Sequence, residues 1–321
     1  MTFNPRFPLS NRHIQTLYAP LFRKDLALTL SLERFELCDG DFVDCHWYHQ
    51  PKPQTTKPIV ILFHGLEGSS QSPYIQGMMF ALAQKGYASV LMHFRGCSGE
   101  ANRLARAYHS GDIEDAKAWI SHIHQHFPLA PLHALGYSMG GNMLLKLTAQ
   151  WGKDLPLTSV ASVSAPLDLE ICAKSIQKGF ARVYQKHLLK HLKSTLWEKY
   201  HSHPLDKLIG LSPQKIKSIQ SIWDFDEEYT AKIHGFGTAQ NYYHCSSAKQ
   251  YLKDIRIPTL IIHALDDPFM SSDILPKPSE LSPHICLEVL PKGGHVGFVH
   301  GSFFRPKYWL EERIMQYFSY T

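Results

Sequence analysis

Short apolar runs alternate with segments of helical periodicity along most of this chain. The strand-like runs IVILF, YASVLMHF, LHALGY and SVASVSA are separated by helix-like segments such as AKAWISHIHQHF. Strands that alternate with helices in this way pair in parallel through right-handed crossovers. Two more strand-like runs, PTLIIHAL and HICLEVLP, and a helix-like YWLEERIMQYF follow near the C-terminus. The sequence therefore predicts an α/β fold with a mostly parallel sheet flanked by helices, and a hairpin over residues 35–49 before it.

The alternation stops between about residues 167 and 250. Long amphipathic stretches such as FARVYQKHLLKHLKSTLWEKY occur there without strand-like runs beside them. We expect a helical cap inserted into the sheet at this point. The predicted organisation is a core of residues 1–166 and 251–321, of which 1–34 form an N-terminal arm, with the cap over 167–250.

The stretch LHALGYSMGGNMLLK places Ser138 between Gly136 and Gly140, where an apolar run gives way to a helical one. A serine on such a strand-to-helix corner sits in a sharp turn. The residues two before and two after it come so close that side chains would collide, and glycine removes the collision. The pattern is typical of a nucleophile held at the end of a strand.

Polar residues also follow the other strand-like runs. In an open parallel sheet, ligands bind outside the carboxyl ends of the strands. The residues found there are, in chain order, the HGLEG loop from His64 to Gly68, then Ser138, then Asp266 and Asp267, and last His295. Serine, acid and histidine thus occur in one chain order, each at a strand end.

These residue types suit acyl transfer. A serine hydroxyl becomes a nucleophile when an imidazole removes its proton, and the imidazole needs an acid to orient it. We expect His295 to be the base, and the N–H groups of Met139 and Leu66 to stabilise the oxyanion. Neighbouring residues on an extended chain point in opposite directions, so only one of Asp266 and Asp267 can face His295. Asp168 is an outside candidate for the acid.

The motifs HGLEG, GYSMGG, ALDDP and GGH resemble those of the α/β-hydrolase superfamily. The segments NRHIQT, FRGCSGE, YHSGDIED and FGTAQNYY are similar to its YheT-like branch and to the plant EMB8 proteins. The resemblance implies a serine esterase or lipase fold with a helical cap. It also implies triad roles for Ser138, Asp267 and His295, with Asp266 as a loop-bracing residue.

Histidines on helix-like segments could suggest a metal site. His122, His124 and His126 form one group, and His187 and His191 another, but neither has a third ligand at a recognisable spacing. We predict no metal and no cofactor. Three further residues lie in branch-specific segments and are interpreted as bracing the loop beneath the site, without a chemical role: Arg95, His109 and Asp112.

Composition indicates which binding partners and which cellular location to expect. The net charge of +5 is modest and the basic residues are scattered, so no nucleic-acid partner is expected. The six cysteines form no CxxC pair, the N-terminus does not read as a signal peptide, and no apolar run is long enough to cross a bilayer. We expect a cytoplasmic protein. For Lys186, Lys190 and Lys193 a solvated surface is preferred over contact with an anionic membrane. The oligomeric state is not predicted.

The predicted function is hydrolysis of carboxylic esters with short to medium acyl chains, through an acyl-enzyme on Ser138. A small-molecule ester or a lipid would be the substrate. Thioesterase or perhydrolase chemistry with the same residues, and a non-catalytic lipid-binding or interaction protein, are the alternatives. We expect the acyl site to be walled by apolar cap side chains, namely Phe180, Tyr184, Leu188, Leu192, Trp197 and Trp223.

Overall fold

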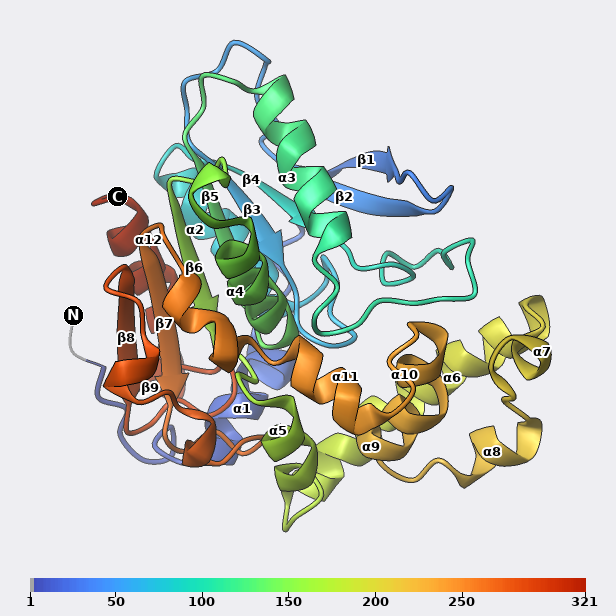
Figure 1. Ribbon diagram of the computed structural model, residues 1–321. Helices are drawn as coiled ribbons and strands as arrows, with labels where there is room; N and C mark the ends of the chain where they lie inside the picture. Colours follow the sequence, from blue (N-terminus) through green and yellow to red (C-terminus); the bar gives the residue numbers. More distant parts are fainter. Residues whose placement is uncertain (1–2) are drawn as a thin grey trace.

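A computed structural model describes residues 3–321 of the chain. One sheet has eight strands in the order β1-β2-β4-β3-β5-β6-β7-β8 (Figure 1). These strands are β1 (Ser31–Glu36), β2 (Phe42–Tyr48), β3 (Ile59–Phe63), β4 (Ala88–Met92), β5 (Leu132–Tyr137), β6 (Ser159–Val163), β7 (Thr259–Ala264) and β8 (Ile285–Leu290). β1 and β2 form an antiparallel hairpin that pairs antiparallel with β4, and every other neighbouring pair is parallel. The predicted α/β fold and hairpin are confirmed.

Helices cover both faces of the sheet. They are α2 (Pro73–Gln84) and α12 (Trp309–Phe318) on one face, and α3 (Glu114–His126) and α4 (Met139–Trp151) on the other. The fully buried strand β3 serves both layers, because Ile59, Ile61 and Phe63 pack with α3 and α4 while Val60 and Leu62 pack with α2. Successive side chains of a strand point to opposite faces, so a strand covered on both sides is apolar throughout. This explains the unbroken apolar runs in the sequence.

Between β6 and β7 the chain runs through helices without a strand. They are α5 (Leu169–Ser175), α6 (Ala181–Ser202), α7 (Leu205–Ile209), α8 (Pro213–Ser218), α9 (Ile222–Phe225), a π-helical turn (Asp226–Thr230), α10 (Ala231–Ile233) and α11 (Ala239–Ser246). Leu189, Leu192 and Leu196 of α6 pack with Leu205 and Phe225 in a small core of their own. Figure 1 shows these helices beyond the carboxyl edge of the sheet. Division of the chain into a core and a cap domain stays a prediction.

The N-terminal segment contains a helix, α1 (Arg12–Phe22), that the sequence analysis did not predict. Its buried Gln15 accepts a hydrogen bond from the N–H of Val299 and donates one to the carbonyl of Val299, each at 2.7 Å. Val299 opens a second hairpin of β9 (Val299–Ser302) and β10 (Arg305–Tyr308). Short 3₁₀ turns complete the described chain, at Gly152–Asp154, Ala248–Asp254, Ser272–Ile274 and Pro278–Glu280. Among the helices of residues 3–321, none has the length and apolar character needed to span a membrane.

Candidate active site

Ser138 lies on the turn between β5 and α4. Its backbone has φ 49° and ψ −121°, a conformation that non-glycine residues rarely adopt. A Cβ atom on Gly136 would lie 2.4 Å from the carbonyl oxygen of Gly140, and one on Gly140 would lie 2.4 Å from that of His64. The predicted collision at both glycine positions is therefore confirmed.

A continuous chain of hydrogen bonds joins Ser138, His295 and Asp267. The Oγ atom of Ser138 is 2.9 Å from Nε2 of His295, and Nδ1 of His295 is 2.8 Å from Oδ2 of Asp267. Asp267 accepts only when Nδ1 carries the proton, which leaves Nε2 of a neutral ring to accept from the serine hydroxyl. The three residues follow β5, β8 and β7, so the parallel pairing of these strands brings them to one edge.

The three candidate acids have different surroundings. Asp267 is 2% exposed, and its second oxygen, Oδ1, accepts the N–H of Phe269 at 2.8 Å. Asp266 instead accepts the N–H of Gly294 at 2.9 Å and so braces the loop before His295, while burial raises the pKa of Asp266. Asp168 caps α5 by accepting the N–H of Ile171. The structure thus brings Asp267 to His295 and gives the other two carboxylates local roles.

His295 is held by residues that the sequence analysis did not single out. Its N–H donates to Oγ1 of Thr16 on α1 at 3.0 Å, and the ring of Phe269 stacks on its imidazole with centroids 4.1 Å apart. The next N–H, of Val296, donates to Oγ of Ser164 at 3.2 Å. Thr16 ends the segment NRHIQT, so the branch-specific motif was a signal for it. No sequence pattern distinguished Phe269 from an ordinary loop residue.

The HGLEG loop packs directly against Ser138. A Cβ atom on Gly65 would lie 3.2 Å from that of Ser138. The N–H groups around Leu66 are used within the loop or by tyrosine hydroxyls: Gly65 donates to Tyr74, Glu67 to Tyr108 and Gly68 to the carbonyl of Gly65. Leu66 N–H donates to no atom of residues 3–321. Met139 is the first residue of α4, where N–H groups lack partners within a helix. Both residues line the same cavity as Ser138.

Two buried histidines brace the loops around this edge. His64 donates from Nδ1 to the carbonyl of Gly65 at 2.6 Å and accepts at Nε2 from the N–H of Phe94, and burial lowers its pKa to about 3. His93 donates to the carbonyl of Asp44 and accepts from the N–H of Ser70, and burial lowers its pKa to about 4. Each ring is therefore neutral at physiological pH and uses both nitrogens.

A cavity of about 450 Å³ lies between the edge of the sheet and the inserted helices, and it reaches Ser138 and His295. Tyr184, Leu188 and Leu192 line it, as expected, from one face of α6. The expectation was wrong for Phe180, Trp197 and Trp223. Phe180 precedes α6 and is exposed, whereas Trp197 lies on another face of that helix and packs in the small core of the insertion. Trp223 packs against Tyr243, with ring centroids 5.1 Å apart.

A buried carboxyl and a buried amine of the inserted helices are among the side chains that line the cavity. Asp226, in the π-helical turn, accepts the hydroxyl of Tyr243 at 2.7 Å, and burial raises its pKa to about 7. Lys199 of α6 donates to Oδ1 of Asn102 at 2.6 Å and to the carbonyl of Leu104 at 2.8 Å. Burial lowers the pKa of Lys199 to about 8.

Arg95 has the bracing role that the sequence analysis proposed for it. Its guanidinium forms two hydrogen bonds with Asp115 at the start of α3, at 2.6 and 2.7 Å. It also donates to Asp39 and Asp41 in the turn of the N-terminal hairpin, at 2.8 and 3.0 Å. A buried guanidinium paired on both sides ties the hairpin to the loop that precedes α3.

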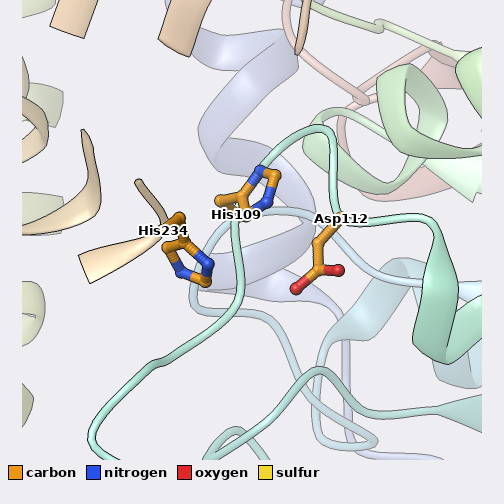
Figure 2. Close-up of side chains that lie close together, drawn as sticks. All are labelled: His109, Asp112 and His234. Carbon is orange, nitrogen blue, oxygen red and sulfur yellow. The ribbon is translucent and has the colours of Figure 1, made fainter. Parts of the chain in front are cut away.

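His109, Asp112 and His234 place three potential metal-ligand atoms within 4.8 Å of one another (Figure 2). Within residues 3–321, Oδ2 of Asp112 and Nε2 of His234 have no hydrogen-bond partner. Two features disfavour a cation. Nδ1 of His109 accepts the N–H of Gly111 at 3.2 Å, which leaves the proton of the neutral ring on Nε2.

The second feature is the charge around the cluster. Burial lowers the pKa of both histidines, that of His234 to about 4, and the nearby cation Arg106 lowers both further.

The histidine groups considered from sequence have other contacts. Nε2 of His122 lies 3.1 Å from Oε1 of Glu33, and the rings of His187 and His191 pack edge to face. The absence of a metal stays a prediction.

Comparison with known proteins gives a family match, two informative sequence relatives and a similar solved structure. Residues 58–302 match the family described as "alpha/beta hydrolase fold". The chain is 46% identical over 312 residues to "Putative esterase YheT" of Escherichia coli (strain K12), across 97% of this chain and 91% of that one. It is 29% identical over 310 residues to "Phospholipase ABHD3" of Mus musculus, across 94% and 74% of the two chains.

Among solved structures, an esterase of Pyrococcus furiosus aligns with a TM-score of 0.58 at 14% identity, across 99% of this chain and 97% of that one. At this identity the likeness concerns the fold alone. Together the matches confirm the predicted resemblance to the YheT-like branch.

Proposed function

The chain belongs to the α/β-hydrolase family, and on that premise we propose that it is a serine hydrolase of carboxylic esters. The hydrogen-bonded chain from Ser138 through His295 to Asp267, at the end of an apolar cavity, carries this proposal. Such a chain activates a hydroxyl, and the cavity supplies a place for an acyl group.

In the first half of the proposed reaction, Oγ of Ser138 attacks the ester carbonyl while Nε2 of His295 takes the hydroxyl proton. The carbonyl oxygen becomes an oxyanion that accepts hydrogen bonds from the N–H groups of Leu66 and Met139. When the intermediate collapses, the C–O bond to the alcohol breaks and His295 gives its proton to the leaving oxygen. Asp267 holds the ring in the required tautomer and stabilises its charged form.

In the second half, His295 removes a proton from water, which attacks the acyl carbonyl. The bond from Ser138 to the acyl group then breaks, and the proton returns to the serine oxygen. This cycle transfers an acyl group to water without a change of oxidation state. We therefore propose no cofactor.

The cavity supports an ester with an apolar acyl chain of short to medium length. Its lining is dominated by aliphatic and aromatic side chains, among them Leu66, Leu188 and Phe225. Its volume of about 450 Å³ is in the range of small-molecule sites. The similarity to a protein named as a phospholipase supports a lipid as substrate.

Covalent labelling tests the proposal. A fluorophosphonate should label the wild-type protein stoichiometrically, and the protein should hydrolyse p-nitrophenyl esters. Ser138→Ala should abolish labelling and reduce turnover by roughly four to six orders of magnitude. Ser218→Ala is the control, because that serine is exposed on α8 and its hydroxyl bonds only to the carbonyl of Lys215.

A folded wild-type protein that takes no label and cleaves neither esters nor thioesters would contradict the proposal and favour a lipid-binding protein. Preferential cleavage of thioesters would retain the mechanism and change the substrate class.

A further inference from the structure

Large apolar side chains are exposed on three segments that meet at α1. Of the twelve large hydrophobic residues that are exposed in the described chain, six belong to these segments. They are Phe7, Leu21 and Phe22 from the N-terminal segment, Phe180 and Val183 at the start of α6, and Phe304 in the β9–β10 turn. Phe304 is 91% exposed and Phe7 is 87% exposed, so these rings have little packing of their own. We call these six residues the α1 face.

Contacts between rings show that the three segments are neighbours. The ring centroid of Phe22 lies 5.4 Å from that of Phe303, and the centroid of Phe303 lies 5.4 Å from that of Phe304. The end of α1 therefore adjoins the β9–β10 turn. At the other end of α1, His13 lies 4.5 Å from Phe180. In Figure 1, α1, β9 and the connection from α5 to α6 all lie in the lower part of the molecule. The exposed side chains therefore gather around one helix.

The same segments are free of acidic residues. Asp and Glu make up 28 of the 321 residues, yet none occurs in residues 3–24, 171–197 or 289–310. These stretches carry exposed cations beside the apolar side chains, namely Arg6, Arg12, Lys24, Lys178, Arg182, Lys186, Lys190, Arg305 and Lys307. Of the acids that flank these stretches in sequence, Glu311 pairs with Arg23, Glu170 with Lys174 and Glu288 with Arg313, whereas Asp25 and Glu198 are exposed.

The three segments also line the cavity that contains Ser138. Thr16 and Leu17 line it from α1, Tyr184 and Leu188 from α6, and Val296 from the loop before β9. α1 and α6 therefore carry residues of the α1 face and residues of the cavity wall on the same elements. A lipid ester that left a bilayer here would meet segments that also border the reactive serine.

We propose that the α1 face docks onto an anionic lipid surface, which reverses the preference for a solvated surface that sequence alone gave for Lys186 and Lys190. Exposed aromatic and aliphatic side chains flanked by Lys and Arg bind the interface of a membrane, where the apolar groups enter the acyl boundary and the cations contact anionic headgroups. A second copy of the chain is a poorer occupant, because two copies of this face would bring like charges together. Docking itself does not require catalysis, but its use in presenting a lipid ester to Ser138 rests on the proposed function.

Vesicle flotation with the full-length protein tests the proposal. The protein should float with vesicles of phosphatidylcholine and phosphatidylglycerol, much less with phosphatidylcholine alone, and binding should weaken as salt is added. The double variant Phe22→Ser/Phe304→Ser should lower the partition coefficient by about tenfold or more, because two exposed rings no longer enter the interface. Leu32→Ser/Leu129→Ser is the control, since both leucines are large, exposed and apolar but belong to β1 and to the loop before β5.

Each preparation is also labelled with a fluorophosphonate and assayed on a short soluble ester, and both readouts should be the same for the double variant and the wild type. The inference is overturned if the wild type does not bind anionic vesicles at low salt. It is also overturned if both double variants lose binding equally, or if Phe22→Ser/Phe304→Ser instead dissolves a dimer seen by light scattering. Vesicle binding without labelling would refute the proposed function and leave the docking surface standing.

Discussion

At the carboxyl edge of the sheet, Ser138, His295 and Asp267 each have a specific hydrogen-bond partner, whereas the inserted helices face the same cavity with mainly apolar side chains. The edge is built on strands whose positions are set by main-chain ladders. The inserted helices are positioned by side-chain packing, as in the small core around Leu192 and Leu196.

This difference separates two kinds of requirement. Reacting atoms need positions accurate to a fraction of an ångström, which strand ends and their loops provide. A cavity for an acyl chain needs volume and apolarity, which many combinations of helix side chains can supply. We therefore expect substitutions at the edge to change the rate of the reaction and substitutions in the insertion to change substrate preference and stability.

The largest expected effect separates the two adjacent carboxylates. Asp267→Asn should lower kcat by about a thousandfold or more, because an amide at this position favours the wrong imidazole tautomer. Asp266→Asn should lower it far less, since an amide oxygen can still accept the N–H of Gly294. Steady-state kinetics on one ester gives both values. A larger loss for Asp266→Asn than for Asp267→Asn would show that the observed geometry is not the reacting one.

The second largest effect is expected on the pH dependence of the free energy of unfolding, through the buried carboxyl of Asp226 in the insertion. Its pKa of about 7 in the folded protein lies above the usual value of 3.8, because the carboxyl is buried. The folded state therefore binds the proton more tightly than the unfolded state. The stability that this proton contributes is fully present below about pH 3.8 and is lost as pH rises towards 7.

Asp226→Asn keeps an oxygen for the Tyr243 hydroxyl but cannot ionise. Its free energy of unfolding should exceed that of the wild type at pH 8 by roughly 4 kcal/mol, and the difference should vanish near pH 4. Urea unfolding at both values of pH measures this. Asp206→Asn, an exposed residue of α7, should show no comparable change with pH. A difference independent of pH would mean that the buried carboxyl does not titrate as described.

The smallest expected effect concerns acyl preference. Leu188→Ala removes part of the cavity wall, so kcat/KM for a ten-carbon ester should fall about threefold to tenfold relative to an acetyl ester. Leu208→Ala is the control, because that leucine is in the same insertion but exposed on α7. An equal change for both substrates would indicate that Leu188 affects folding or access, and that the acyl chain lies elsewhere.

Much of this organisation could be predicted from sequence because it is encoded over short distances along the chain. The strands, the helix α4 and the turn at Ser138 follow from the period of apolar residues and from the glycines two residues to either side. His295 could be proposed because two glycines precede it at a strand end. Each of these signals lies within about ten residues of the element that it predicts.

For the contribution of α1, the branch-specific segment NRHIQT was a signal that Thr16 matters, but it did not indicate what Thr16 contacts. Thr16 contacts His295 across 279 residues of sequence, and Gln15 bonds to Val299 across 284. Nothing in the local pattern of residues 1–34 indicates which loop they will meet. The sequence likewise did not predict which side of α6 faces the cavity. As residue types, Trp197 and Leu192 suit an apolar wall equally well.

The sequence by itself determined the strand and helix pattern, the residue types at the strand ends and their order along the chain, because periodicity and turn chemistry act between near neighbours. Only the tertiary structure decided that Thr16 holds the backbone of His295, that Phe269 stacks on its ring, and which face of α6 lines the cavity. It also brings Asp267 to His295, where strand alternation alone had left Asp266 open and only the family resemblance favoured Asp267. These outcomes depend on how distant elements pack. Packing minimises empty space over the whole molecule at once, so no single stretch of sequence contains the answer.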